Sequence, residues 1–289
     1  MTESYANPDA LVSTAWLADH LGDASIVVVD ITKYLPNEPK DGKAEYLNAR
    51  IPGARYLDID AVADRSSDLP HMLPDPAGFA AAMEALGIAN AHRIVFYDQK
   101  GMASAARGWW MMRAFGHDAA SVLDGGLPKW VAEGRPTESG APAAPAQAVF
   151  APAFRPWLVR DRSAVLGNVA TRAEQVVDAR PAGRFDGTVP EPRAGLRGGH
   201  IPGSSNVPHL TLLNADATFR AAPELRAILA KAGVDGTRPV IASCGSGVTA
   251  CAIAFAAHLV GHPDVAVYDG SWTEWGGHPD TPVETTTHA

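Results

Sequence analysis

Cys244 has the sequence surroundings of a nucleophile. It follows the apolar run PVIAS, which predicts a buried strand, and it precedes the loop GSGVT and the run ACAIAFAAHLV, which predicts a helix. A short glycine-containing loop between a strand and a helix N-terminus points successive backbone N–H groups inward, and the helix dipole adds to their field. Such a nest holds an anion and stabilises a thiolate. We therefore expect Cys244 to be a reactive thiolate rather than a core thiol.

The rest of this loop is expected to shape the nest and to bind the substrate. Gly245 and Gly247 allow backbone angles that a side chain would forbid. With them, Val248 and Thr249 are the expected substrate-binding residues of the loop. Cys251 falls inside the predicted helix and is expected to be a small core side chain. Two cysteines make no disulfide framework and have no zinc-ligand spacing, so we expect no metal site.

Arginines cluster in the segment before this loop. Four of them lie between residues 180 and 197, and a planar guanidinium is suited to recognition of a small carboxylate. Arg184 and Arg193 are nine residues apart across the proline-containing stretch TVPEP, so one loop can turn both side chains toward the same ligand. The alternatives are plain surface solubility for the cluster and a surface salt bridge for the pair.

The chain contains an internal repeat. In the first half IVVVD ends at Asp30, RIPGA spans 50–54, RIVFYD ends at Asp98 and VLDGGLPKW spans 122–130. The counterparts QVVDAR, HIPGS, PVIASC and VYDGSWTEW follow in the same order 145 to 150 residues later. We interpret this as a tandem duplication with domains at 1–138 and 158–289, joined by a linker rich in proline and alanine at 139–157. Asp98 stands where the second half has Cys244, so we expect the first domain to be catalytically silent and to support or wall off the site.

Short β-branched runs alternate with helical patterns in each half. Runs such as IVVV and PVIA are apolar on both faces, as in a parallel strand covered by helices on each side. The fold class is therefore α/β, with a small parallel sheet flanked by helices in each domain. Strands are predicted at 26–30, 93–98, 175–179, 239–243 and 265–268, and helices at 14–21, 76–86, 103–115, 222–232 and 248–260.

Composition excludes several classes of protein. The net charge of −8 disfavours nucleic acid as a partner. The uncharged apolar stretch around Cys251 is eight residues long, whereas a membrane span needs roughly 18, so no membrane association is expected. The first basic residue is Lys33, which argues against secretory and mitochondrial targeting segments. We expect a cytoplasmic protein.

These residues resemble the two-domain rhodanese-like sulfurtransferases, in particular those that use 3-mercaptopyruvate. The resemblance covers nearly the whole chain, and its specific signals are the loop CGSGVT and the pair GRF and EPR, whereas the HIPG-type turns mark only the superfamily. The segments that carry it are LDID and HMLP within 57–74, WWMMRAFGH at 109–117, LDGGLPKW at 123–130, GRFDGTVPEPR at 183–193, GHIPGS at 199–204, CGSGVTAC at 244–251 and YDGSWTEW at 268–275.

The resemblance implies a reaction and roles for residues. Cys244 would take sulfur from 3-mercaptopyruvate as a persulfide, release pyruvate, and pass the sulfur to cyanide or to a thiol such as thioredoxin or a small thiol. Arg184 and Arg193 would bind the carboxylate and keto oxygen, and Ser246 would assist in the loop. Attack of a thiolate on sulfur needs no cofactor, and positive charge at the carboxylate end of the substrate helps both binding and charge development.

Three other functions compete with this one. A thiosulfate sulfurtransferase of this fold typically has Arg and Lys beside its cysteine, where this chain has Gly245 and Ser246; thiosulfate remains the alternative donor. A cysteine phosphatase usually closes a longer loop with an arginine six residues after the cysteine, where this chain has Ala250. A non-catalytic binding module fits only the first half.

One departure from the family concerns a histidine relay. In this family a histidine of the first HIPG turn, with an aspartate nine residues earlier, has been viewed as a triad with the loop serine. Here the turn reads RIPG, so Arg50 stands in the histidine's place and Asp41 precedes it. We expect Asp41 and Arg50 to lie at the domain interface, as an ion pair or as a source of positive potential, and the enzyme to work without a histidine relay. His200, in the equivalent turn of the second half, is expected to be structural.

Overall fold

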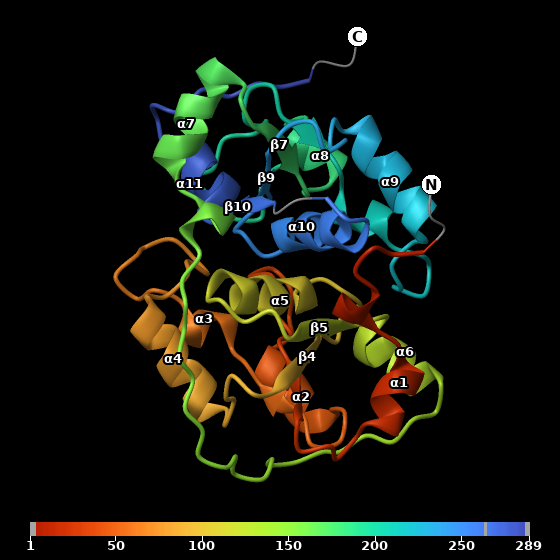
Figure 1. Cartoon of the computed structure of the whole chain (residues 1–289). Helices are drawn as coiled ribbons and strands as arrows, with labels where there is room; N and C mark the ends of the chain where they lie inside the picture. Colours follow the sequence, from red (N-terminus) through yellow and green to blue (C-terminus); the bar gives the residue numbers. More distant parts are fainter. Residues whose placement is uncertain (1–3, 263–264, 287–289) are drawn as a thin grey trace.

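The computed structural model describes residues 4–262 and 265–286 and shows two parallel β-sheets built on one plan (Figure 1). The first sheet has the strand order β1-β5-β4-β2-β3 and the second β6-β10-β9-β7-β8, and every strand pair is parallel. The predicted α/β class with two tandem domains is thereby confirmed. The strands are β1 (Leu11–Val12), β2 (Ile26–Asp30), β3 (Arg55–Tyr56), β4 (Arg93–Tyr97), β5 (Ala120–Leu123), β6 (Val159–Arg160), β7 (Gln175–Asp178), β8 (Ser205–Asn206), β9 (Val240–Ser243) and β10 (Ala266–Tyr268).

Helices cover both faces of each sheet. Ser13 caps α1 by accepting from the N–H of Trp16 at 3.0 Å, and Asp75 caps α4 ahead of Pro76, as expected for these residue types. The helices are α1 (Thr14–Asp19), α2 (Gly42–Asn48), α3 (Ile59–Val62), α4 (Pro76–Ala85), α5 (Ala105–Ala114), α6 (Gly126–Ala132), α7 (Arg162–Thr171), α8 (Ala182–Phe185), α9 (Ala222–Lys231), α10 (Ala250–Leu259) and α11 (Ser271–Gly277), with 3₁₀ turns at Pro8–Ala10, Pro156–Leu158 and His209–Leu212. All ten predicted elements are present, with ends shifted by at most two residues.

The two domains meet through α5 and α10, which lie side by side at the boundary (Figure 1). Trp109 of α5 packs edge-on against Phe255 of α10, with ring centroids 4.9 Å apart. Both side chains belong to one hydrophobic core that runs through both domains. A large apolar interface of this kind fixes the domains relative to each other.

The segment 139–155 has no helix or strand, but it is a strap that packs on the first domain rather than a free linker (Figure 1). Gly140 donates its N–H to the carbonyl of Leu47 at 2.8 Å, and the side chain of Phe150 is buried. The start of the chain contacts the second domain. The N–H of Ala6 donates to the carbonyl of Leu259 at 2.7 Å. Among the residues that the structure describes, none of the helices has both the length and the apolar character of a membrane span.

Candidate active site

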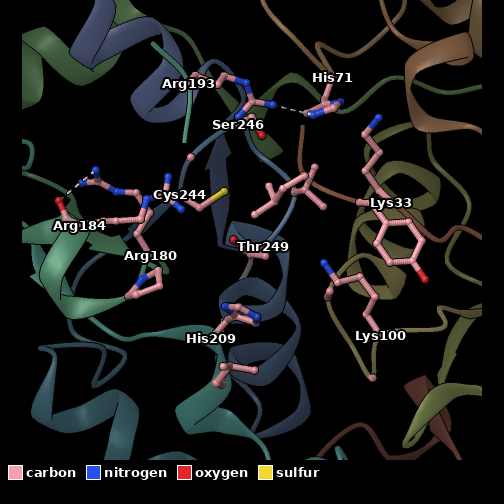
Figure 2. Close-up of a pocket in the computed structure, with 18 residues that line it drawn as sticks. Lys33, His71, Lys100, Arg180, Arg184, Arg193, His209, Cys244, Ser246 and Thr249 are labelled. Atoms are coloured by element: carbon pink, nitrogen blue, oxygen red, sulfur yellow. Dashed lines mark hydrogen bonds between the residues drawn. The ribbon is translucent and has the colours of Figure 1, made fainter. Parts of the chain in front are cut away.

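A cavity of about 300 Å³ lies where the loop after β9 faces the first domain (Figure 2). Figure 2 shows Arg180, Arg184 and Cys244 on one side of it and Lys33 and Lys100 on the other. The second domain contributes Arg180, Pro181, Arg184, Arg193, His209, Leu210, Cys244, Gly245, Ser246, Val248 and Thr249, and the first domain Lys33, Tyr34, Leu35, His71, Lys100, Gly101 and Ala103.

The loop predicted to form an anion nest begins at Cys244 and borders the cavity. Cys244 follows the last residue of β9; its side chain lines the cavity, its N–H donates to Oγ of Ser271 at 3.1 Å, and its carbonyl accepts from the N–H of Trp272 at 2.9 Å. The backbone N–H groups of residues 245–249 find no acceptor within the described part of the chain. They are therefore free for an anion held beside the Cys244 sulfur.

The two loop glycines differ in how closely they are packed. A Cβ on Gly245 would come within 2.9 Å of Nη2 of Arg184, which is the end of a flexible side chain and can move. Gly247 has φ +75°, and a Cβ there would lie 2.6 Å from the carbonyl oxygen of Asp269. Gly247 does not line the cavity, unlike the other loop residues predicted to bind substrate, so its part is to shape the loop.

Cys251 has the core position expected for it. It is fully buried in α10, and its Sγ donates to the carbonyl of Gly247 at 3.3 Å. Burial raises the pKa of Cys251 to about 12, so this thiol stays protonated and is no nucleophile.

Arg184 lines the cavity and also makes a salt bridge, with a buried carboxylate rather than on the surface as the alternative role had it. Its Nε lies 3.1 Å from Oε2 of Glu191, which belongs to the TVPEP stretch. The buried Glu191 carboxylate is shared with Arg180, whose Nη1 lies 2.8 Å from Oε1, and Arg180 also binds Asp178 at 2.6 Å. The ion pairs hold Arg184 in place at the cavity wall.

Arg193 meets a residue that the sequence analysis missed. Its Nη2 lies 3.3 Å from Nε2 of His71, a buried histidine of the first domain that lines the cavity. Nδ1 of His71 in turn lies 2.7 Å from Oδ1 of Asp60. Burial lowers the pKa of His71 and of Arg193, and the bond with His71 lowers the pKa of Asp60. The one sequence signal that could have identified His71 was its position in the HMLP segment, which carries the family resemblance. The structure adds that its backbone has a positive φ of 64°.

The prediction for Asp41 and Arg50 is wrong. Neither residue lines the cavity. Arg50 is buried, donates from Nη1 to the carbonyl of Gly140 at 2.7 Å, and lies 3.6 Å from Glu138, because its backbone pairs with Glu138 just before the strap. Asp41 instead caps α2, accepting from the N–H of Ala44 at 2.7 Å. The cavity histidine that contacts Arg193 is His71, so Arg50 does not take a histidine's place there.

The equivalent loop of the first domain is filled by its own side chain. The Asp98 carboxylate accepts from the N–H groups of Lys100, Ser104 and Ala105 at 2.9, 2.8 and 2.9 Å. An anion nest occupied in this way has no place for a substrate, which agrees with a silent first domain. His200 stacks on Phe185 with ring centroids 3.8 Å apart, outside the cavity lining, as expected of a structural residue.

Comparisons with known proteins match this architecture. The family model of the rhodanese-like domain matches twice, at residues 13–133 and 162–278. Human 3-mercaptopyruvate sulfurtransferase is 43% identical over 272 residues, covering 92% of this chain and 91% of that protein. Thiosulfate sulfurtransferase of Bos taurus is 44% identical over 273 residues with the same coverage.

The solved structures agree with the sequence comparisons. The crystal structure of SseA from Escherichia coli, described with the rhodanese fold of 3-mercaptopyruvate sulfotransferases, is 41% identical with a TM-score of 0.83. The match covers 91% of this chain and 98% of that one. With two matched domains and relatives above 40% identity along most of its length, the chain belongs to the two-domain rhodanese-like sulfurtransferases.

Proposed function

We propose that this chain transfers sulfur from 3-mercaptopyruvate through a persulfide on Cys244 to cyanide or a thiol. The observation that carries the choice of donor is the uncharged loop beside Cys244, where Gly245 and Ser246 stand, together with two arginines at the cavity wall. Relatives named for either donor match at nearly the same identity, so the donor is argued from these residues.

The reaction balances without a cofactor. The Cys244 thiolate attacks the sulfur of 3-mercaptopyruvate, a new S–S bond forms, and the C–S bond breaks with its electron pair leaving as pyruvate enolate. The proton of the substrate thiol ends on the methyl group of pyruvate. An acceptor thiolate then attacks the outer sulfur, and Cys244 returns to its thiolate form.

The residues around the cavity have distinct proposed roles. Arg184 and Arg193 hold the substrate carboxylate and keto oxygen, where charge grows as the enolate forms. The N–H groups of Gly245, Val248 and Thr249 stabilise the anionic sulfur. Ser246 assists in the same loop, near His71 at the Arg193 end of the cavity (Figure 2).

Thiosulfate is the second candidate donor because two lysines also line the cavity. Lys33 and Lys100 would suit a dianion, but each already has a carboxylate partner: Lys33 pairs with Asp60, and Lys100 lies 2.6 Å from Glu38. Arg184 is paired as well, with Glu191, so pairing does not rank the two donors. We place thiosulfate behind 3-mercaptopyruvate because the residues next to Cys244, Gly245 and Ser246, carry no charge.

A panel of donors tests the proposal. The chain is incubated with 3-mercaptopyruvate, thiosulfate or a phosphomonoester, with cyanide as acceptor, and pyruvate, thiocyanate and phosphate are measured. Pyruvate release with matching thiocyanate, at a higher kcat/KM than for thiosulfate, is the expected result. Higher kcat/KM for thiosulfate would overturn the choice of donor, and phosphate release would overturn the reaction class.

The biological acceptor and compartment are part of the same proposal. We infer that a thiol, either a small thiol or thioredoxin, receives the sulfur in the cytoplasm. Cys244 must remain a free thiol to accept sulfur, and a reducing compartment favours that state. Coupled turnover with reduced thioredoxin and cell fractionation test the two parts.

A further inference from the structure

We propose that Arg107, in helix α5 of the catalytically silent domain, is a positioning residue that fixes the sulfur-binding loop and His71 relative to each other. The proposal rests on the proposed function in taking Cys244 as the reacting residue. Arg107 does not line the cavity, so it can act on the reaction only through the groups it holds.

The guanidinium of Arg107 binds three separate segments of the chain. Nη1 donates to the carbonyl of Gly247 at 3.1 Å and to Oδ1 of Asp269 at 2.6 Å. Nη2 donates to the carbonyl of His71 at 2.6 Å. Because the group is planar and rigid, the two carbonyls are held at a defined separation. One belongs to the loop that carries Cys244 and the other to the histidine that contacts Arg193.

Asp269 completes the junction from the second domain. Its other oxygen, Oδ2, accepts from the N–H of Leu73 at 2.7 Å. Arg107 and Asp269 therefore each make a hydrogen bond to the backbone of the segment that contains His71. Its backbone carbonyl and Arg107 are the groups against which Gly247 packs without a Cβ. The Arg107 side chain is fully buried and that of Asp269 nearly so.

Burial makes this contact specific for arginine. A buried charge that loses its partner is strongly unfavourable, so the pair constrains the domains to the geometry that satisfies both groups. Lysine offers a point charge and cannot reach both carbonyls and the carboxylate in one plane. The loop and His71 come from different domains, and Arg107 together with Asp269 joins them.

The proposal predicts a loss of rate and a change in the reactivity of Cys244. In Arg107→Lys, kcat for sulfur transfer should fall by roughly ten- to a hundredfold, since small misplacement of reacting groups has effects of that size. The KM for the donor should change less, because Arg184 is held by Glu191 independently of Arg107. A displaced loop should also stabilise the thiolate less, so alkylation of Cys244 by iodoacetamide should require higher pH.

Two controls separate positioning from general loosening. Arg93→Lys makes the same substitution at an arginine of the first domain that binds the carbonyl of Asp9 at 2.6 Å, outside the cavity lining. Asn7→Ala removes a bond across the domain boundary, from Nδ2 of Asn7 to the carbonyl of His258 at 2.7 Å. Both should keep the wild-type kcat and alkylation profile.

The outcomes decide among the possibilities. A folded Arg107→Lys with unchanged kcat and alkylation profile overturns the proposal, and so does an equal effect in Asn7→Ala. If Arg107→Lys does not fold, Asp269→Asn takes its place, because it keeps the shape of the side chain and removes its charge. Asp269→Asn must then shift the pH profile of Cys244 alkylation in the same direction, and an unshifted profile overturns the proposal. Iodoacetamide needs no sulfur donor, so this readout stands even if wild type releases no pyruvate and the proposed function fails.

Discussion

Arg193 of the second domain donates a hydrogen bond to Nε2 of His71 of the first domain across 3.3 Å. Arginine has only donors, so Nε2 must be the unprotonated nitrogen of the ring. Nδ1 therefore carries the proton and faces Asp60 at 2.7 Å. The chain Asp60–His71–Arg193 thus orients a guanidinium at the cavity, and it needs a neutral histidine.

This neutral histidine gives a prediction for stability as a function of pH. Burial lowers the pKa of His71 below its ordinary value of 6.5, so below that pH the unfolded chain binds a proton that the folded chain does not. The contribution of His71 to the free energy of unfolding should therefore be present above pH 6.5 and decrease as the pH falls.

Denaturant unfolding of wild type and His71→Gln over a pH series measures this contribution. The difference in free energy of unfolding between the two should shrink below pH 6.5, the ordinary value for histidine. Three other histidines, His117, His209 and His262, also have lowered pKa values, but they are common to both proteins and cancel. A difference that grows on acidification would mean that His71 is protonated in the folded state.

The persulfide should form on Cys244. After incubation with 3-mercaptopyruvate, intact mass should rise by about 32 Da for one sulfur. Cys244→Ser should abolish the gain, while Cys251→Ser should keep it because the buried Cys251 thiol has its pKa raised to about 12. Loss of the gain in Cys251→Ser, with Cys244→Ser unaffected, would reverse the assignment.

Arg184→Ala and Arg193→Ala should each lower kcat/KM for 3-mercaptopyruvate. A lost charge-assisted hydrogen bond costs about 1.5–3 kcal/mol, or roughly ten- to 150-fold. Arg184→Ala should also destabilise the fold, because the buried Glu191 keeps only Arg180 as partner. Wild-type kcat/KM in both variants would mean that neither arginine binds the substrate and that Arg184 serves only in its salt bridge with Glu191.

A charged loop should change the preference for the donor. Gly245→Arg combined with Ser246→Lys should raise the ratio of thiosulfate to 3-mercaptopyruvate turnover, because a dianion gains more from added positive charge. The structure adds a cost, since a Cβ at Gly245 meets Arg184 at 2.9 Å, so 3-mercaptopyruvate turnover should fall as well. Ser246→Lys alone avoids that contact and should shift the ratio in the same direction. An unchanged ratio in both variants would mean that the loop charge does not select the donor.

Local patterns explain which parts of the fold were predictable from sequence. Strands β2 and β9 were predictable because they are apolar runs buried on both faces. Strands β3 and β8 have two residues each at sheet edges, too short to have a period. The loop around Cys244 was predictable because its members are contiguous.

The contact between Arg193 and His71 was not predictable in this way. The two residues are 122 positions apart and meet only because the domains dock through α5 and α10. The same limit explains the error at Arg50. Its place in the repeat is equivalent to that of His200, but equivalence in a repeat says nothing about which groups of the other domain lie nearby.

Restoring a histidine at position 50 should therefore give no gain in sulfur transfer. Arg50 faces the strap, where it binds Gly140 and Glu138 and stacks over Tyr46 with the guanidinium 5.0 Å from the ring centroid. Arg50→His removes these contacts, so we expect roughly 1–3 kcal/mol less stability with kcat/KM close to wild type. His71→Gln provides the matched comparison, because it changes the cavity histidine that contacts Arg193 and should lower kcat/KM through the displaced Arg193. Thermal unfolding and turnover of the two variants, measured side by side, test this. A higher kcat in Arg50→His with a new ionisation near neutral pH would show that position 50 reaches the reacting groups after all.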